Sequence, residues 1–178
     1  MANKEPKVKV QNLTKKFGDL LVLDNLNFEV EEGEFLCIVG PTGCGKTTFL
    51  NSLTRLYEPT AGDILVNGIP VNPKKQNISY IFQEYSSFPW LTVEQNIRFG
   101  LEIKKTPKAE ADANVEEMLD IVGLTKFRNY YPSQLSISML QRVAIARAFA
   151  TKPELLLMDE PYGQLDIDLR FKLEDELI

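Results

Sequence analysis

A glycine-rich segment at residues 40–47, GPTGCGKT, constrains the fold more than any other part of the sequence. Residues 35–39 before it form a short continuous apolar run, which predicts a buried strand. After it, apolar residues recur at helical spacing as far as about residue 57. A strand that enters a glycine-rich turn and leaves as a helix directs several backbone N–H groups and a helix N-terminus at one point. The pattern therefore predicts a binding site for a polyanion such as a nucleoside triphosphate.

The polar side chains of this loop have defined tasks in such a site. Lys46 is expected to reach the β- and γ-phosphates, and the Thr47 hydroxyl is expected to be available to Mg²⁺. The alternative is a strand–helix turn that contains Gly-Lys-Thr without a ligand, and the strand and helix context favours the binding interpretation. The residues expected around the triphosphate are Gly40, Pro41, Thr42, Gly43, Cys44, Gly45, Lys46, Thr47 and Thr48.

Composition narrows the class of protein and of partner. The chain has 178 residues, 44% of them hydrophobic, which is enough for one domain with a subdomain. Its 20 basic and 25 acidic residues give a net charge of −5, and the basic residues are scattered, so nucleic acid is not an expected partner. Cys37 and Cys44 are the only cysteines, and we expect them to stay unpaired in a reducing cytoplasm.

No segment of the sequence has the pattern of a membrane anchor. Residues 1–9 are polar and charged, without the apolar centre of a signal peptide. No apolar run approaches the roughly 20 residues that a membrane-spanning helix needs. We therefore expect any connection to a membrane to be made through a partner protein.

Apolar and alternating runs predict several strands. Between residues 62 and 71, an Asn-Gly pair lies between apolar flanks, which is a strong hairpin signal. The strand near residue 80 is expected to end on Gln83. Besides the strand before the glycine-rich loop, the expected strands are residues 8–13, 21–30, 78–82 and 155–158.

From Thr92 onward the pattern is mainly helical. Thr92 is followed three residues later by a glutamine, as in a capping box. Apolar residues between positions 111 and 122 form one helical face, and Gly123 follows them as a C-cap. A further helix is expected to begin at Ser136 or Ser138 and to run through residue 150. Strands and helices in this order predict an α/β core with a helical insert.

The short strand at residues 155–158 delivers two carboxylates at its end. Asp159 is expected to hold Mg²⁺, directly or through water, and Glu160 points to the other side of the strand, where it can accept a proton from an attacking water. Acidic residues end many strands, so the segment alone is weak evidence. Together with an upstream phosphate loop it favours the hydrolysis of a phosphoanhydride.

Several ordered motifs over essentially the whole chain resemble those of the ATP-binding cassette (ABC) ATPases, the nucleotide-binding subunits of ABC transporters. Besides the two segments above, these motifs are Gln83 in FQE, the Leu-Ser pair at residues 135–136, QRVAIARA at 141–148 and GQLD at 163–166. The resemblance implies ATP as the nucleotide, since the loop itself reads phosphates and not the base. It also implies a P-loop fold of the ABC ATPase type, with an antiparallel β subdomain and an inserted helical subdomain.

The resemblance assigns further roles by position. Gln83 would sense metal and water and link to a membrane partner, and Asp166 would lie at a dimer interface. Phe17 matches the aromatic residue that stacks on adenine, and a core position is an equal alternative. The implied catalytic residues are Glu160, Gln83 and Lys46; the implied metal ligands are Thr47, Gln83 and Asp159; and the nucleotide site adds Phe17, Gln83, Ser136, Asp159 and Asp166 to the loop.

The resemblance also implies an architecture and partners. Within a single domain 1–178, residues 1–84 would form the P-loop core and antiparallel β region, residues 85–135 the helical subdomain, and residues 136–178 the remainder. Implied partners are a second ATPase subunit, a transmembrane permease and, indirectly, a solute-binding protein, with the chain at the cytoplasmic face of the cell membrane. Residues 81–93 look like those of importers for nitrate, taurine and aliphatic sulfonates. Phe88 and Trp90 would then receive the permease's coupling helix, or are core aromatics.

The sequence departs from this family in two places. Ile137 and Ser138 stand where two glycines follow Leu-Ser, and Leu140 stands where glutamine is usual, although Ser136 is retained. The chain has no histidine, whereas the family has a histidine beyond the segment that corresponds to GQLD, where it holds the γ-phosphate and the attacking water. We therefore expect a C-terminally truncated or degenerate member that lacks core strands. Two alternatives remain: a nucleotide-binding module that does not turn over, and a soluble ABC-type ATPase of DNA repair or translation, which the acidic balance and the lack of heptads disfavour.

Overall fold

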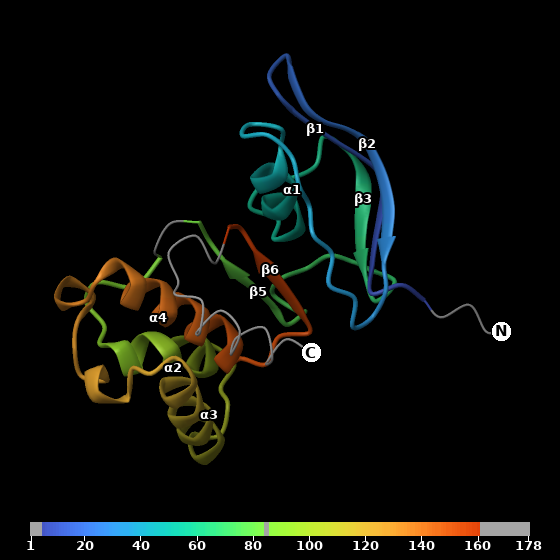
Figure 1. The fold of residues 1–178 in the computed structure, drawn as a ribbon. Helices are drawn as coiled ribbons and strands as arrows, with labels where there is room; N and C mark the ends of the chain where they lie inside the picture. Colours follow the sequence, from blue (N-terminus) through green and yellow to red (C-terminus); the bar gives the residue numbers. More distant parts are fainter. Residues whose placement is uncertain (1–4, 84–85, 161–178) are drawn as a thin grey trace. The chain divides into compact units, whose positions relative to one another are not determined.

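The computed structural model describes residues 5–83 and 86–160. The chain divides into two compact units, Met1–Gln76 and Asn77–Ile178 (Figure 1), and each is considered by itself. Asp166 and the rest of the GQLD segment lie outside the described residues.

The first unit contains an antiparallel sheet. Its strands are β1 (Val8–Phe17), β2 (Leu20–Val30), β3 (Ala61–Val66) and β4 (Ile69–Pro70), in the order β2-β1-β3-β4. Apolar residues of β1 and β3 lie on a shared inner face, where Val10 is paired with Ile64 and both are buried. The strands predicted at residues 8–13 and 21–30 are therefore confirmed, the first being longer than expected.

The hairpin between β3 and β4 is confirmed as predicted from the Asn-Gly pair. Asn67 and Gly68 have φ angles of 52° and 71°, so both central residues are left-handed, as a type I′ turn requires. The turn places Val66 opposite Ile69, which gives the short β4 its register.

Helix α1 (Lys46–Leu53) follows the glycine-rich loop. It buries Phe49 and Leu53, and the Phe49 ring lies 5.4 Å from that of Phe28 on β2. The helix is shorter than the expected extent to about residue 57. Arg55 has a φ of 57°, which breaks the helical path, and the Tyr57 N–H donates to the Asn51 carbonyl in a turn.

The prediction of a buried strand at residues 35–39 is wrong for the described structure. Phe35 is 65% exposed and Val39 is 85% exposed, and no strand includes the segment. Within residues 5–83 and 86–160, neither sheet pairs with it. A buried strand needs partners for its backbone N–H and C=O groups, so an apolar run without a neighbouring strand stays in irregular conformation. Cys37 is exposed rather than buried, and both cysteines are free, as expected.

The second unit begins with a pair of parallel strands. β5 (Ile78–Ile81) pairs with β6 (Leu155–Met158), with Ile78 opposite Leu155 and Ile81 opposite Met158. Asn77 ties the start of the pair together: its N–H donates to the Glu154 carboxylate at 3.0 Å, and its side chain donates to the Lys152 carbonyl at 2.8 Å. Because the strands are parallel and in register, their carboxyl ends meet at one edge.

Three helices pack on one another in this unit (Figure 1): α2 (Val93–Ile103), α3 (Lys108–Ile121) and α4 (Ile137–Ala150). The short 3₁₀ helices η1 (Thr125–Phe127) and η2 (Pro132–Gln134) connect α3 to α4. The capping box is present, with Thr92 as N-cap of α2 and Gln95 as its partner. The predicted face of α3 is buried, as are the residues of α2 and α4 that it meets: Val93, Ile97, Leu101, Ala111, Val115, Met118, Leu119, Val122, Val143, Ile145 and Ala146.

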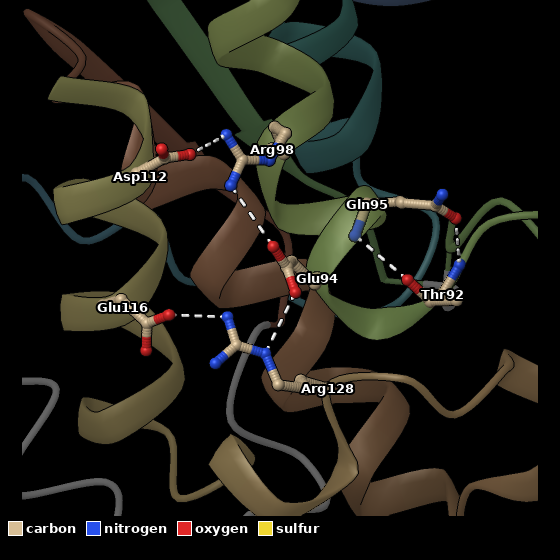
Figure 2. Close-up of polar contacts among 7 residues, drawn as sticks. All are labelled: Thr92, Glu94, Gln95, Arg98, Asp112, Glu116 and Arg128. Atoms are coloured by element: carbon tan, nitrogen blue, oxygen red, sulfur yellow. Dashed lines mark hydrogen bonds and ion pairs between the residues drawn. The ribbon is translucent and has the colours of Figure 1, made fainter. Parts of the chain in front are cut away.

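A charged network joins the helices on the outside of this core (Figure 2). Glu94 of α2 accepts from Arg98 at 3.2 Å and from Arg128 at 3.0 Å. Arg98 also pairs with Asp112 at 2.6 Å, and Arg128 pairs with Glu116 at 2.5 Å, both on α3. Arg128 follows η1, so the network connects α2 and α3 with the chain that leaves α3.

Among the residues that the structure describes, no helix combines the length and apolar character needed to cross a bilayer.

Glu94 gives the second unit a predicted dependence on pH. Burial alone would raise the pKa of Glu94, but hydrogen bonds from Arg128 and Arg98 outweigh burial, and the net pKa is lowered. The ion pairs therefore contribute fully above the ordinary carboxyl pKa and are lost as the pH falls through the lowered value. Replacing Glu94→Gln should reduce the free energy of unfolding by about 1–2 kcal/mol near neutral pH, and this difference should shrink on acidification. Urea unfolding followed by far-UV circular dichroism measures both.

The control is Glu117→Gln, because Glu117 is half exposed and meets Lys152 only at 4.0 Å. It should change the free energy of unfolding by less than about 0.5 kcal/mol. A Glu94→Gln effect that is equally large at neutral and acidic pH would contradict the role given to the carboxylate charge.

Candidate functional site

The glycine-rich loop is exposed, and its backbone has positive φ angles at two glycines before α1. Gly45 is the N-cap of α1 with a φ of 103°, and Gly43 has a φ of 81°. A Cβ on Gly45 would lie 3.0 Å from Leu23 Cδ2 and 3.2 Å from the Val22 carbonyl oxygen, both on β2. Glycine is therefore required at position 45 by its φ and by the close approach of the loop to the sheet.

The side chain of Lys46 curls back over the loop. Its Nζ donates to the Gly40 carbonyl at 2.9 Å and to the Pro41 carbonyl at 3.2 Å. These contacts hold the ammonium group at the mouth of the loop, beside the start of α1. The loop thus carries a cation, and its contact with phosphate groups stays a prediction.

The start of α1 also offers unused backbone donors. No side chain caps the helix, and its first internal hydrogen bond runs from the Phe49 N–H to the Gly45 carbonyl at 2.9 Å. The N–H groups of the preceding positions have no partner within the helix, as at any helix N-terminus. Thr47 is exposed there. Uncapped donors, a positive helix end and a lysine ammonium fit a polyanion such as a triphosphate.

Phe17 lies at the end of β1 and is 42% exposed, so the core alternative for this residue is wrong. Its ring meets Tyr57 edge to face at 5.3 Å, and the Lys15 ammonium lies 4.8 Å from its centroid. An exposed aromatic face beside a cation suits a stacked base, and adenine stacking on Phe17 stays a prediction.

The second unit brings together the polar residues at the ends of β5 and β6. Asp159 is 5% exposed, and its N–H continues the strand pairing by donating to the Ile81 carbonyl at 3.0 Å. Glu160 is exposed, whereas Asp159 is buried. Gln83 Nε2 donates to Glu160 Oε2 at 3.1 Å, so Gln83 and Glu160 meet across the two strand ends.

Sequence reasoning missed a neighbour of the buried carboxylate. The Tyr80 hydroxyl on β5 donates to Asp159 Oδ2 at 3.4 Å. A buried carboxylate requires hydrogen-bond partners, so a tyrosine on the adjacent predicted strand was the available signal.

Ser136 begins α4 as its N-cap, which decides between the two serines considered. Its Oγ accepts from the Met139 N–H at 3.3 Å. Ile137 follows and is 51% exposed, so an apolar side chain stands at the surface of this helix start, where glycine would leave the backbone open. The Ser136 hydroxyl still has its own hydrogen to donate.

The two aromatic residues after Gln83, Phe88 and Trp90, differ in their exposure to solvent. Phe88 is half-buried, with its ring 4.3 Å from Phe99 of α2, whereas Trp90 is 69% exposed. The core alternative therefore does not hold for Trp90.

The site residues thus fall into two groups. Phe17 and the loop residues 40–48 belong to the first unit, and Gln83, Ser136, Asp159 and Glu160 belong to the second. Within residues 5–83 and 86–160, no group of three His, Cys, Asp or Glu side chains could hold a metal. The residues predicted for Mg²⁺, Thr47, Gln83 and Asp159, supply hydroxyl, amide and carboxylate oxygens, which is the chemistry that Mg²⁺ prefers.

A comparison with protein families matches residues 23–163 to the family described as ABC transporter. A sulfate/thiosulfate import ATP-binding protein of Synechocystis is 46% identical over 167 residues, covering 92% of this chain and 47% of that protein. An uncharacterized ABC transporter ATP-binding protein of Methanocaldococcus jannaschii is 46% identical over 176 residues, covering 97% of this chain and 66% of that protein. A Brucella abortus protein named for ATP binding is 44% identical over 174 residues, with 98% and 67% covered.

Solved structures show the same likeness. A dimeric ATP-binding cassette in a post-hydrolysis state, bound to ADP and Pi, superimposes with a TM-score of 0.86 at 35% identity and covers 96% of this chain and 81% of that one. An ATP-binding subunit of an ABC transporter gives a TM-score of 0.87 at 26% identity. The chain spans from about half to two thirds of the length of the curated relatives named above.

Proposed function

Because the chain belongs to the ABC transporter family, whose ATP-binding subunits share its α/β cassette fold and hydrolyse ATP, we propose that it binds ATP with Mg²⁺ and couples ATP hydrolysis to transport. The observation that carries this proposal is the glycine-rich loop, where the Lys46 ammonium bonds to the loop carbonyls and α1 begins without a side-chain cap. The bound ADP and Pi of the similar dimeric cassette support ATP as the ligand.

The residues of the chain divide the work of hydrolysis. The loop residues and Lys46 bind and orient the triphosphate, and Phe17 stacks on the base. Thr47, Gln83 and Asp159 would hold Mg²⁺, which when bound neutralises phosphate charge. Glu160 accepts a proton from the attacking water, while Gln83, which donates to it, holds its carboxylate in place.

We further propose that two copies act together beneath a permease. The dimeric state of similar cassettes supports the second copy, to which Ser136 would present its hydroxyl and the start of α4. Asp166 would lie at this dimer interface. Exposed Trp90 would receive a helix of the permease, which places the chain at the cytoplasmic face of the membrane. A solute-binding protein would act through the permease.

The proposed cargo class is a small anion such as nitrate, a sulfonate or taurine. The residues between Gln83 and Thr92 support this assignment by their likeness to importers of such solutes. The sulfate/thiosulfate import protein named above also supports an oxyanion, although it belongs to a different group. Cargo contacts would be made by the permease and the solute-binding protein.

A second candidate is an ATP-binding module that does not turn over. The observation that favours it is exposed Ile137 at the start of α4, where glycine is usual. A β-branched residue restricts close backbone approach to a γ-phosphate.

Lys46 tests the nucleotide site. Replacing Lys46→Ala removes the only side-chain cation of the loop, so it should abolish binding of a fluorescent ATP analogue, measured by titration. The matched control is Lys9→Ala on β1, because Lys9 is paired with Glu29 on the sheet and should bind like the wild type. Unchanged affinity in Lys46→Ala would remove the assignment of the loop.

Glu160 separates the two candidates. If the chain turns over, Glu160→Gln should lower the rate of phosphate release at least about a hundredfold, because general-base catalysis is lost, while leaving binding of the ATP analogue intact. Equal phosphate release by both proteins, with binding retained, would instead establish the non-hydrolysing module.

A further inference from the structure

Arg147 makes contacts that no motif of the sequence predicted. It lies near the end of α4 and reaches the segment that follows Gln83: its Nη1 donates to the Ser86 carbonyl at 2.7 Å and its Nη2 to the Ser86 Oγ at 2.6 Å. Two short bonds from one guanidinium fix orientation as well as distance, because the planar fork has little freedom once both are made.

The same guanidinium also meets an aromatic ring. Its central carbon lies 5.2 Å from the centroid of Phe88, and the Phe88 ring in turn lies 5.6 Å from the ring of Trp90. Burial lowers the pKa of Arg147, since the charged group is largely removed from water. A buried cation that remains charged needs close partners, and here those partners are Ser86 and the face of Phe88.

A second polar residue holds this segment from the opposite helix. Asn96 of α2 is fully buried; its Oδ1 accepts from the Phe88 N–H at 2.8 Å, and its Nδ2 donates to the Leu91 carbonyl at 3.0 Å. Residues 86–91 are therefore hydrogen-bonded to α4 through Arg147 and to α2 through Asn96. Within this segment, Trp90 is 69% exposed.

We infer that Arg147 is a positioning residue that fixes residues 86–91 to α4 and so links the orientation of exposed Trp90 to the helix that Ser136 begins. The purpose of this link rests on the proposed function. There, Ser136 is proposed to contact the nucleotide of the second copy, and Trp90 is proposed to contact the permease. A movement of α4 would carry Ser86 and Phe88 with it, and Trp90 would follow. Asn96 alone would leave the segment attached to α2 and independent of α4.

The experiment uses amide hydrogen exchange and the fluorescence of Trp90, the single tryptophan of the chain. Arg147→Met keeps the aliphatic stem but removes the fork, so exchange at the Phe88 and Leu91 amides should rise about tenfold. Trp90 anisotropy should fall in the same variant. Arg147→Lys, which keeps the charge but not the fork, should give an intermediate increase of about threefold.

The matched control is Arg142→Met on the same helix, because Arg142 donates to the Val122 carbonyl. It should leave exchange at Phe88 and Leu91 as in the wild type. If Arg147→Met does not fold, Ser86→Ala removes only the hydroxyl acceptor and should raise exchange by about threefold with the fold intact. Exchange and anisotropy equal to those of the wild type in folded variants would overturn the inference.

A final measurement distinguishes a failure of this inference from a failure of the proposed function. With the fluorescent ATP analogue bound, the wild type should show a change in Trp90 anisotropy that Arg147→Met lacks, although both bind the analogue equally. A role limited to stability would lower the unfolding midpoint without abolishing this response, and that result would count against positioning. Failure of the wild type to bind the analogue would overturn the proposed function, while the exchange results on the free protein would still decide the role of Arg147.

Discussion

The parallel pairing of β5 with β6 is the constraint on which the rest of the second unit depends. These strands are far apart in the sequence, yet their register places Ile81 opposite Met158 and so brings Gln83 within 3.1 Å of Glu160. The strand is apolar up to Met158, and the next residue, Asp159, is buried: its N–H donates to the Ile81 carbonyl, and its carboxylate accepts from the Tyr80 hydroxyl, as a buried carboxylate requires. A slip of one residue would exchange the buried and exposed carboxylates.

Polar side chains hold the irregular backbone around this pair. The Asn77 side chain bonds to the Thr151 and Lys152 carbonyls before β6. Asn96 of α2 and Arg147 of α4 both bond to the chain that precedes α2. Each of these side chains satisfies backbone groups that lie outside regular structure, which a buried irregular segment requires. The helices therefore support the end of β5 through directed bonds as well as through apolar packing.

Local signals predicted local structure well. The Asn-Gly hairpin, the capping box at Thr92 and the apolar face of α3 each depend on residues a few positions apart, and all three are present. The strand at residues 35–39 was wrong because an apolar run indicates burial but not the partner that would bury it. The contact of Arg147 with Ser86 could not be predicted, since it joins residues more than sixty positions apart whose side chains show no spacing rule. The ligand roles of the loop and of Asp159 remain predictions.

The central proposal is that the glycine-rich loop binds ATP and that Asp159 is a ligand of the accompanying Mg²⁺. The most direct measurement is the affinity for a non-hydrolysable ATP analogue, by calorimetry, with and without Mg²⁺, in the wild type and in Asp159→Asn. We expect Mg²⁺ to strengthen binding to the wild type, and Asp159→Asn to retain the Mg²⁺-free affinity but to lose the strengthening. An equal effect of Mg²⁺ on both proteins would contradict it.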